Sequence, residues 1–236
     1  MALRTRWYLA WLTVALSATA CAPVAQWSPG QVDSVADKIA SAAIEQWGLS
    51  KGVPREAKLR DESKRLLSDP AFAAAMNKRP QWVASEDWIN RLELEGYPLL
   101  TDDELRRFLG ASSRLLNEAT DAECAAFMRL KSGDFGPRAG ADGAIWRQRL
   151  ARISEDDFDI YTRTQTDALL ARARRIDELP VTLSEAEYMS GLDALAPYFP
   201  EVTRKKIEPF LDKDPTKLTP MEACTLKRAM LSAQSQ

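Results

Sequence analysis

Signals that start a helix recur along the chain, whereas no useful stretch alternates apolar and polar residues as a strand does. In a capping box, the side chains of a Ser or Thr and of a Glu three residues later each accept the other's backbone N–H. Such boxes occur at Thr101–Glu104, Thr120–Glu123, Ser184–Glu187 and Thr219–Glu222. Because period-two apolar runs are the main sign of strands, the sequence predicts an all-α fold.

Further helices are indicated by apolar stripes and by prolines that follow a cap. Ser28 and Pro29 form a cap and a first helical position, and Gly48 is suited to end the helix that follows. Residues 54–67 read as a charged helix, shorter helices are expected near 70–77 and 85–94, and another begins at Ser154. The sequence therefore predicts a bundle of eight to ten helices joined by short loops.

Several large apolar residues fall on the helical stripes and are predicted to be core. Tryptophans occur both on these stripes and away from them. Trp27, near the N-terminal end, and Trp82, near a helix start, are candidates for exposed anchors to a partner. The residues predicted to face inward are Leu105, Phe108, Leu109, Leu115, Leu116, Cys124, Phe127, Met128, Trp47, Trp88 and Trp146.

Residues 1–20 have the three-part layout of a secretory signal peptide. Arg4 and Arg6 give a positive start, an apolar run follows from Trp7 to about Leu16, and 18–20 form an A-x-A cleavage pattern. The apolar run is shorter than the roughly 20 residues that a membrane-spanning helix needs. The alternative, a short N-terminal core helix, does not explain the basic start or the small residues at the end.

Cys21 follows directly after the expected cleavage point. The stretch 18–21 resembles a bacterial lipobox, although Ala18 stands where Leu is preferred. The resemblance implies lipid attachment at Cys21, a lipidated tether over 21–27 and, because Ala22 rather than Asp follows, the outer membrane. Several acyl chains make a firm anchor, whereas one chain binds only marginally. Simple cleavage after Ala20, leaving Cys21 free or paired, remains the alternative.

The charge balance argues against a nucleic-acid partner. The chain has 32 basic and 34 acidic residues, and the predicted signal removes two arginines and no acid. The mature part then carries 30 basic and 34 acidic residues, a net charge near −4. A basic patch is the usual mark of nucleic-acid binding, so we expect no nucleic acid and no membrane contact beyond the N-terminal lipid.

Two cysteines remain if Cys21 is lipidated. Cys124 and Cys224 form an even pair, which in an oxidising compartment predicts a disulfide. The chain-entropy account gives such a long loop roughly 4–5 kcal/mol of stabilisation. Two buried thiols on separate helices are the alternative.

The chain contains no histidine, which excludes Ser-His-Asp and Cys-His catalysis and removes the common nitrogen ligand of zinc. Residues 48–52 match G-x-S-x-G, but that motif needs a preceding strand and a histidine base, so a turn is expected. Acids at Glu155, Asp156, Asp157 and Asp159 complement the dipole of a helix that starts there. We therefore predict no catalytic residue, metal site or cofactor.

Residues 131–143 form the longest expected connection and hold four of the ten glycines. They either link an N-terminal helical lobe, 28–132, to a C-terminal lobe, 142–236, or present Asp134, Phe135 and Arg138 to a partner. A single domain is the other possibility for the two lobes.

The chain combines a lipoprotein-type signal, a helical sequence without histidine, and two cysteines in the contexts E-C-A-A-F-M-R and E-A-C-T-L-K-R. In this layout it resembles small envelope lipoproteins of Xanthomonas-like and related proteobacteria. Some of these look like immunity proteins. The resemblance implies a periplasmic lipoprotein on the outer membrane that binds and sterically blocks an antibacterial effector toxin from a rival's type IV or type VI secretion system. It assigns no binding residue. An envelope adaptor and a carboxylate-based wall hydrolase are the alternatives.

Overall fold

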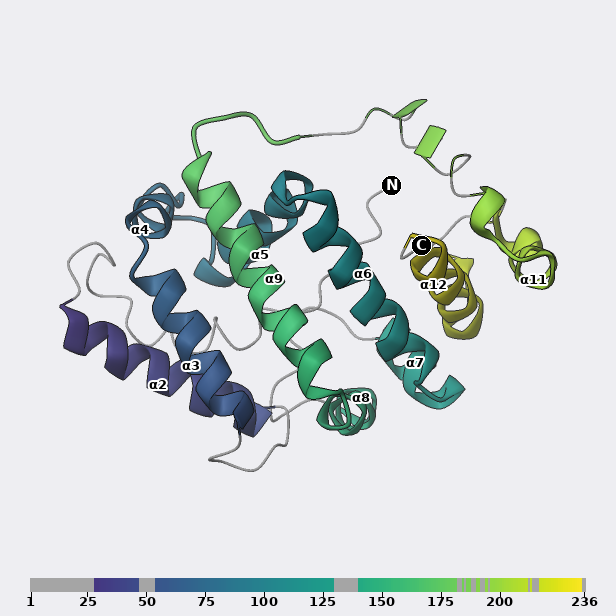
Figure 1. Cartoon of the computed structure of the whole chain (residues 1–236), viewed down its shortest axis with the longest axis horizontal. Helices are drawn as coiled ribbons and strands as arrows, with labels where there is room; N and C mark the ends of the chain where they lie inside the picture. The colour runs from purple at the N-terminus through teal and green to yellow at the C-terminus, as the bar shows by residue number, and fades with distance from the viewer. Residues whose placement is uncertain are drawn as a thin grey trace.

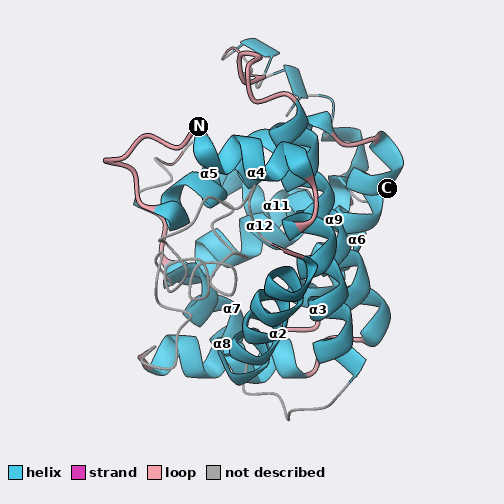
Figure 2. Ribbon diagram, turned by 90° about the vertical axis from the view of Figure 1, so that its left-hand side faces the viewer, coloured by secondary structure: helices cyan, strands magenta, loops and turns pink. Residues whose placement is uncertain are grey.

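A computed structural model describes residues 28–46, 54–129, 140–181, 184, 186–187, 190–191, 194, 196–211, 213 and 217–234. In these residues the chain forms ten α-helices and two short 3-10 helices, with no strand (Figures 1 and 2). The predicted all-α bundle of eight to ten helices is confirmed. The predicted signal peptide and tether, residues 1–27, lie outside the described residues.

The helix bounds follow the sequence signals closely, and residues 54–67 and 70–77 are helical as predicted. The α-helices are α2 (Pro29–Gln46), α3 (Pro54–Leu67), α4 (Pro70–Asn77), α5 (Ser85–Gly96), α6 (Asp102–Asn117), α7 (Asp121–Arg129), α8 (Ala141–Ala151), α9 (Glu155–Arg174), α11 (Glu201–Leu211) and α12 (Pro220–Gln234). The 3-10 helices are η2 (Tyr97–Leu99) and η3 (Ala196–Tyr198).

All four predicted capping boxes form. In each one, the Glu carboxylate accepts the backbone N–H of the capping residue at 2.8 Å, as it does at Thr101, Thr120, Ser184 and Thr219. The capping hydroxyl in turn accepts the backbone N–H of the Glu at 3.2 to 3.3 Å. These bonds satisfy backbone donors that the first turn of a helix leaves unpaired.

The 20-residue helix α9 is the centre of the bundle. It packs against α3, α4, α5 and α6, and it runs diagonally through the middle of the molecule in Figure 1. Phe158 and Leu169 on α9 are almost completely buried. In the first half of α9, Tyr161 meets the ring of Phe108 edge-on at 5.3 Å, and Phe108 stacks on Tyr97 at 5.1 Å.

The hydrophobic core extends across the two ranges that the sequence divided at residues 131–143. Trp146 of α8 and Phe158 of α9 belong to the same buried cluster as Leu59 of α3 and Leu92 of α5. At the other end of the chain, α12 packs against α6 and α7, and α11 packs against α12. The C-terminal helices are therefore attached to the bundle through α12.

Four arginines, one on each of α3, α8, α9 and α12, bind carbonyl oxygens at or just beyond the C-terminal ends of helices, where the last carbonyls lack a partner within the helix. Arg149 and Arg172 are nearly buried, at 4% and 5% exposed. Each arginine also pairs with a carboxylate, so its charge is balanced. The carbonyl contacts are Arg55 to Ile153 at 2.5 Å, Arg149 to Leu115 at 3.1 Å, Arg172 to Glu178 at 3.1 Å and Arg228 to Leu116 at 2.8 Å.

Candidate functional site

Most of the residues singled out in the sequence for lipid attachment and partner binding cannot be placed. Cys21 and the three loop residues Asp134, Phe135 and Arg138 lie outside the described residues. Trp27 and Trp47 also lie outside them. The lipid anchor and the role of the glycine-rich loop in binding therefore stay predictions.

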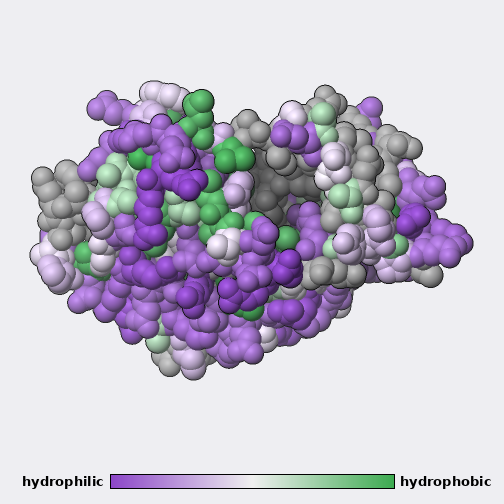
Figure 3. All heavy atoms as spheres, turned by 45° about the horizontal axis from the view of Figure 1, so that its top comes forward, coloured by the Kyte–Doolittle hydropathy of each residue, from purple (hydrophilic) through white to green (hydrophobic). Residues whose placement is uncertain are grey.

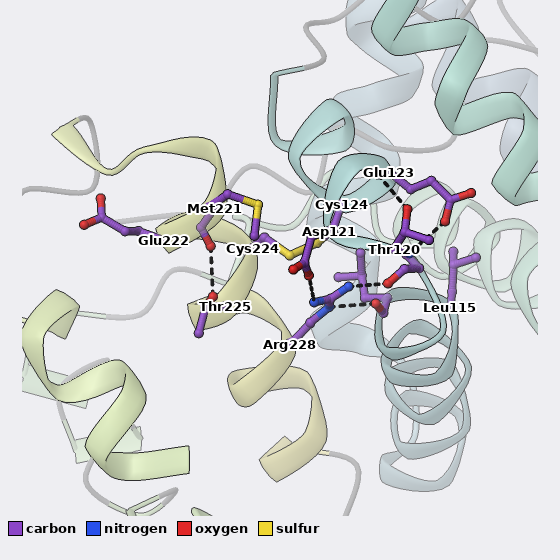
Figure 4. Close-up of a disulfide and its surroundings, with 12 residues drawn as sticks. Leu115, Thr120, Asp121, Glu123, Cys124, Met221, Glu222, Cys224, Thr225 and Arg228 are labelled. Carbon is purple, nitrogen blue, oxygen red and sulfur yellow. Dashed lines mark hydrogen bonds and ion pairs between the residues drawn. A yellow bond between two sulfur atoms is a disulfide. The ribbon is translucent and has the colours of Figure 1, made fainter. Parts of the chain in front are cut away.

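Cys124 of α7 and Cys224 of α12 are joined by a disulfide, as predicted from the cysteine count (Figure 4). Their Cα atoms lie 5.9 Å apart, and both residues are completely buried. Beside the disulfide, Arg228 pairs with Asp121 at 2.9 Å, which adds a second link between α12 and α7. Because the buried disulfide joins two helices that are far apart in the sequence, we assign it a structural role.

The acids at the start of α9 are used in ion pairs with neighbouring helices. Glu155 pairs with Arg55 at 2.6 Å, and Asp157 pairs with Arg114 at 2.5 Å. Within the described residues, no group of three or more His, Cys, Asp or Glu side chains is placed to hold a metal ion. The search for a membrane-spanning helix, made over the same residues, found none of sufficient length and apolarity.

Four apolar residues stand exposed on segments that meet at the C-terminal end of α9, and we call them the apolar surface. Trp82, in the loop between α4 and α5, is 88% exposed, and Leu94 on α5 is 38% exposed. Leu179 and Val181, which follow α9, are 92% and 55% exposed. The face that turns this end of α9 toward the viewer shows hydrophobic residues among hydrophilic ones (Figure 3).

Two ion pairs hold the segments of the apolar surface together. Lys78, at the end of α4, pairs with Asp177 beyond α9. Arg172 of α9 pairs with Glu95 of α5 at 2.7 Å and also donates to the carbonyl oxygen of Glu178 at 3.1 Å. The loop after α4, the helix α5 and the segment after α9 are thus connected at one end of the bundle.

The charges around the apolar surface are largely balanced. Four of the cations form ion pairs with acids on the same or a neighbouring segment, whereas Arg79 donates to the carbonyl oxygen of Val83. These pairs are Lys78–Asp177, Arg91–Glu95, Arg174–Asp69 and Arg175–Glu178. The surface therefore presents apolar area without a strong charge of either sign, which suits an apolar partner surface better than a polyanion.

A buried carboxyl group lies directly next to the apolar surface in the sequence. Glu93 precedes Leu94 on α5 and is only 4% exposed. Tyr97 donates its hydroxyl to Glu93 Oε1 at 2.5 Å. Burial raises the pKa of Glu93 to about 8, and the hydrogen bond from Tyr97 offsets only part of that rise. The carboxyl group is therefore mostly protonated at neutral pH.

The sequence pointed to Trp82 but missed the other members of this region. Leu179 and Val181 flank Pro180, and a proline interrupts a helix. Neither residue therefore belongs to the apolar stripe of a helix, and this was the available sign in the sequence that both could be exposed. Glu93 falls on the stripe formed by Ile89 and Leu92, and an acid on an apolar stripe is a detectable sign of burial.

The described residues define a class of protein: an all-α bundle, closed by one buried disulfide, with an exposed apolar surface and no metal-binding cluster. Comparisons with protein-family models, with curated proteins and with solved structures found no match. The function is therefore argued from the residues and their geometry.

Proposed function

We propose that this chain is a periplasmic, lipid-anchored binding protein of the immunity type, which covers and blocks a secreted antibacterial effector. The observation that carries the proposal is the exposure of Trp82 and Leu179, at 88% and 92%. Tryptophan is seldom so exposed in a folded protein. The segments that carry these two residues are linked by the Lys78–Asp177 pair. Exposed apolar patches mark sites of protein contact, and Trp is enriched among the residues that dominate binding energy.

A protein partner fits the surface better than a charged polymer. The ion pairs around it leave little net charge, and the mature chain carries a mild negative charge near −4. The matching partner surface is an apolar depression that takes the indole of Trp82, with Leu94 and Leu179 packed around it. Stable interfaces of this kind bury roughly 1,200–2,000 Å² in total.

The proposed location rests on the N-terminal sequence. The basic start, the apolar run and the small residues before Cys21 support export and lipid attachment. The disulfide between Cys124 and Cys224 is in keeping with an oxidising compartment. Lipid at Cys21 would hold the protein at the outer membrane, where an incoming effector passes.

The mechanism is steric and needs no catalytic group. The bound protein covers the effector's catalytic cleft, so that the effector no longer reaches its substrate. The segments that carry the apolar surface are already joined by Lys78–Asp177 and Arg172–Glu95. A surface that is ordered before binding loses less conformational entropy when the complex forms, which favours tight binding.

The test is capture of the partner by the full chain. The tagged chain is used as bait for the cell's own secreted and periplasmic proteins, and the captured protein is assayed with and without the bait. We expect one lytic or lipid-degrading effector, bound in a stable one-to-one complex that abolishes its activity. Trp82→Ala and Leu179→Ala should each weaken that complex by roughly 30-fold, which corresponds to the about 2 kcal/mol typical of a hot spot.

Met221→Ala serves as the matched control, since Met221 is an exposed apolar residue (39%) on α12, away from the apolar surface. It should leave the affinity unchanged, and all three variants should melt as the parent does because their side chains are exposed. If the bait captures envelope-assembly proteins instead, the adaptor alternative is favoured. If it lyses peptidoglycan by itself, the binding proposal is wrong.

A further inference from the structure

The helices α5 and α9 touch backbone to backbone near the end of α5. A Cβ atom added at Gly96 would lie 1.9 Å from the carbonyl oxygen of Ala168, far inside van der Waals contact. No side chain larger than hydrogen fits between the two helices at this point. A shift of α5 away from α9 would therefore break a close backbone contact between the two helices.

Glu93 lies one helical turn before Gly96 and shares its buried side of α5. The one hydrogen bond to its carboxyl group among the described residues comes from the Tyr97 hydroxyl at 2.5 Å. The nearby cations Arg91 and Arg172 both pair with Glu95 instead. An ionised carboxylate buried without a cation is strongly unfavourable, so the closed contact requires a neutral Glu93.

The groups on the packed elements do not supply the missing charge. On α9, Tyr161 donates to Ser112, and Arg172 is occupied by Glu95. The sequence of α4 holds no titratable residue. On η2 the titratable group is Tyr97 itself. The charged residues of α6 and of the segment after α9 are exposed or half-exposed, namely Asp102, Asp103, Glu104, Arg106, Arg107, Arg114, Arg175, Asp177 and Glu178.

A buried donor without a partner lies on the same side of α9. Gln165 is 2% exposed, and its Nε2 atom has no hydrogen-bond partner within the described part of the chain. Gln165 is one turn from Ala168 and one turn from Tyr161, both of which face α5 and η2. The closed contact thus leaves a buried donor of α9 without a partner among the described residues, a condition that rearrangement would relieve.

We propose that the α5–α9 contact is a pH-sensitive latch, closed while Glu93 is protonated and opened locally when its carboxyl group loses the proton to water. On opening, the carboxylate reaches solvent and Gly96 separates from Ala168. Leu94, next in the chain, moves with α5, so the latch also changes the apolar surface. This pH response is a property of the fold and does not depend on the proposed function.

The absence of histidine leaves the relevant pH range almost free of other titrating side chains. Histidine is the residue that ordinarily titrates between pH 5 and 8, and the chain has none. The pKa of Glu93, raised by burial to about 8, lies in that range. Burial also lowers the pKa of Lys227, but Lys227 belongs to α12, which packs against α6, α7 and α11.

Hydrogen–deuterium exchange between pH 6 and pH 9 tests the latch. The full chain carries Cys21→Ser, which removes the one cysteine outside the disulfide, and rates are corrected for the intrinsic effect of pH. With a closed-state pKa of about 8 and an ordinary value of 4.5 in the open state, opening of α5 should become roughly 100-fold more favourable. Protection of α2 should not change.

Glu93→Gln should keep α5 protected throughout, because an amide cannot ionise. Asp87→Asn, at an exposed acid on the same helix, should behave as the parent does. Equal exchange at the two pH values in the parent, or pH dependence that persists in Glu93→Gln, would overturn the proposal. If Glu93→Gln does not fold, carboxyl carbon NMR on the parent decides: a Glu93 midpoint between 7 and 9 supports the latch, and one near 4.5 overturns it.

Discussion

Glu93 and Glu123 are both buried glutamates, at 4% and 8% exposed, but their surroundings act on them in opposite directions. Glu93 has one neutral partner, Tyr97. For Glu123, burial opposes ionisation, but the Thr120 backbone and hydroxyl, together with Arg152, outweigh it and lower the pKa. The same residue type is therefore neutral at one site and ionised at the other, because only one site supplies donors and a cation.

Glu93→Gln should stabilise the protein at neutral and alkaline pH. Because the folded-state pKa, about 8, exceeds the unfolded value of 4.5, the parent loses stability as pH rises from about 5 to 8. The amide avoids that loss, so the free energy of unfolding should rise by about 3 kcal/mol at pH 7 and be unchanged at pH 4. Urea titrations at the two pH values measure it. A variant that is less stable at pH 7 would contradict the assignment.

Glu123→Gln should have the opposite sign. The lowered pKa means that Glu123 stabilises the fold above its unfolded pKa, and this contribution is lost as the pH falls through the folded value. Arg152 is 58% exposed, so solvent screening limits the loss at pH 7 to about 1 kcal/mol or less. The same urea titrations test this, and a gain in stability at pH 7 would contradict it.

At the scale of the helices, Gly96 decides how closely α5 and α9 approach. Gly96→Ala should destabilise the fold by about 3 kcal/mol or more, because the new Cβ would lie 1.9 Å from the Ala168 carbonyl oxygen and force the helices apart. Gly110→Ala is the matched control on α6. Its Cβ would lie 3.5 Å from an Arg114 nitrogen, an ordinary contact, so helix propensity should raise stability by up to about 1 kcal/mol. Thermal melts of both variants test the prediction.

Helix starts could be predicted because their causes are local. The box at Thr101 needs only Glu104, three residues away, and it forms as expected. The sequence predicts that α5 ends near residue 94, but the helix ends at Gly96, because it continues to the point where α9 crosses it. In the sequence, a glycine that ends a helix cannot be told from a glycine that allows a second helix to pack closely. The C-terminal boundary of α5 therefore depends on its long-range packing against α9.

For the core, too, the local sequence predicts only part of what the packing of the helices determines. Phe108, Leu115, Leu116, Trp88 and Trp146 are buried as predicted. Leu105, Leu109 and Met128 are only half-buried, because their positions lie at the edge of a stripe that the partner helices do not fully cover. The sequence offers an exposed Trp82 as one alternative, whereas the exposure of Leu94 and Leu179 depends on how α5 and the segment after α9 are placed.

At the scale of the whole molecule, the disulfide determines how firmly the C-terminal helices are held. Cys124 and Cys224 are 100 residues apart in the sequence, and the chain-entropy account gives a loop of this size roughly 4–5 kcal/mol of stabilisation. The pair α11–α12 meets the bundle through the contacts of α12 with α6 and α7. Its attachment therefore relies on one packed helix, the disulfide and Arg228.

Reduction should consequently loosen the C-terminal helices before the rest of the bundle. We expect a reductant to lower the free energy of unfolding by about 4–5 kcal/mol and to expose α11 and α12 to protease while α9 stays intact. α9 should resist because it is packed against four helices and has its own core residues. The double variant Cys124→Ala, Cys224→Ala should match the reduced parent and should not respond to reductant. Unfolding midpoints and cleavage maps measure both effects, and cleavage that begins in α9 would show that the disulfide holds the whole core rather than its C-terminal edge.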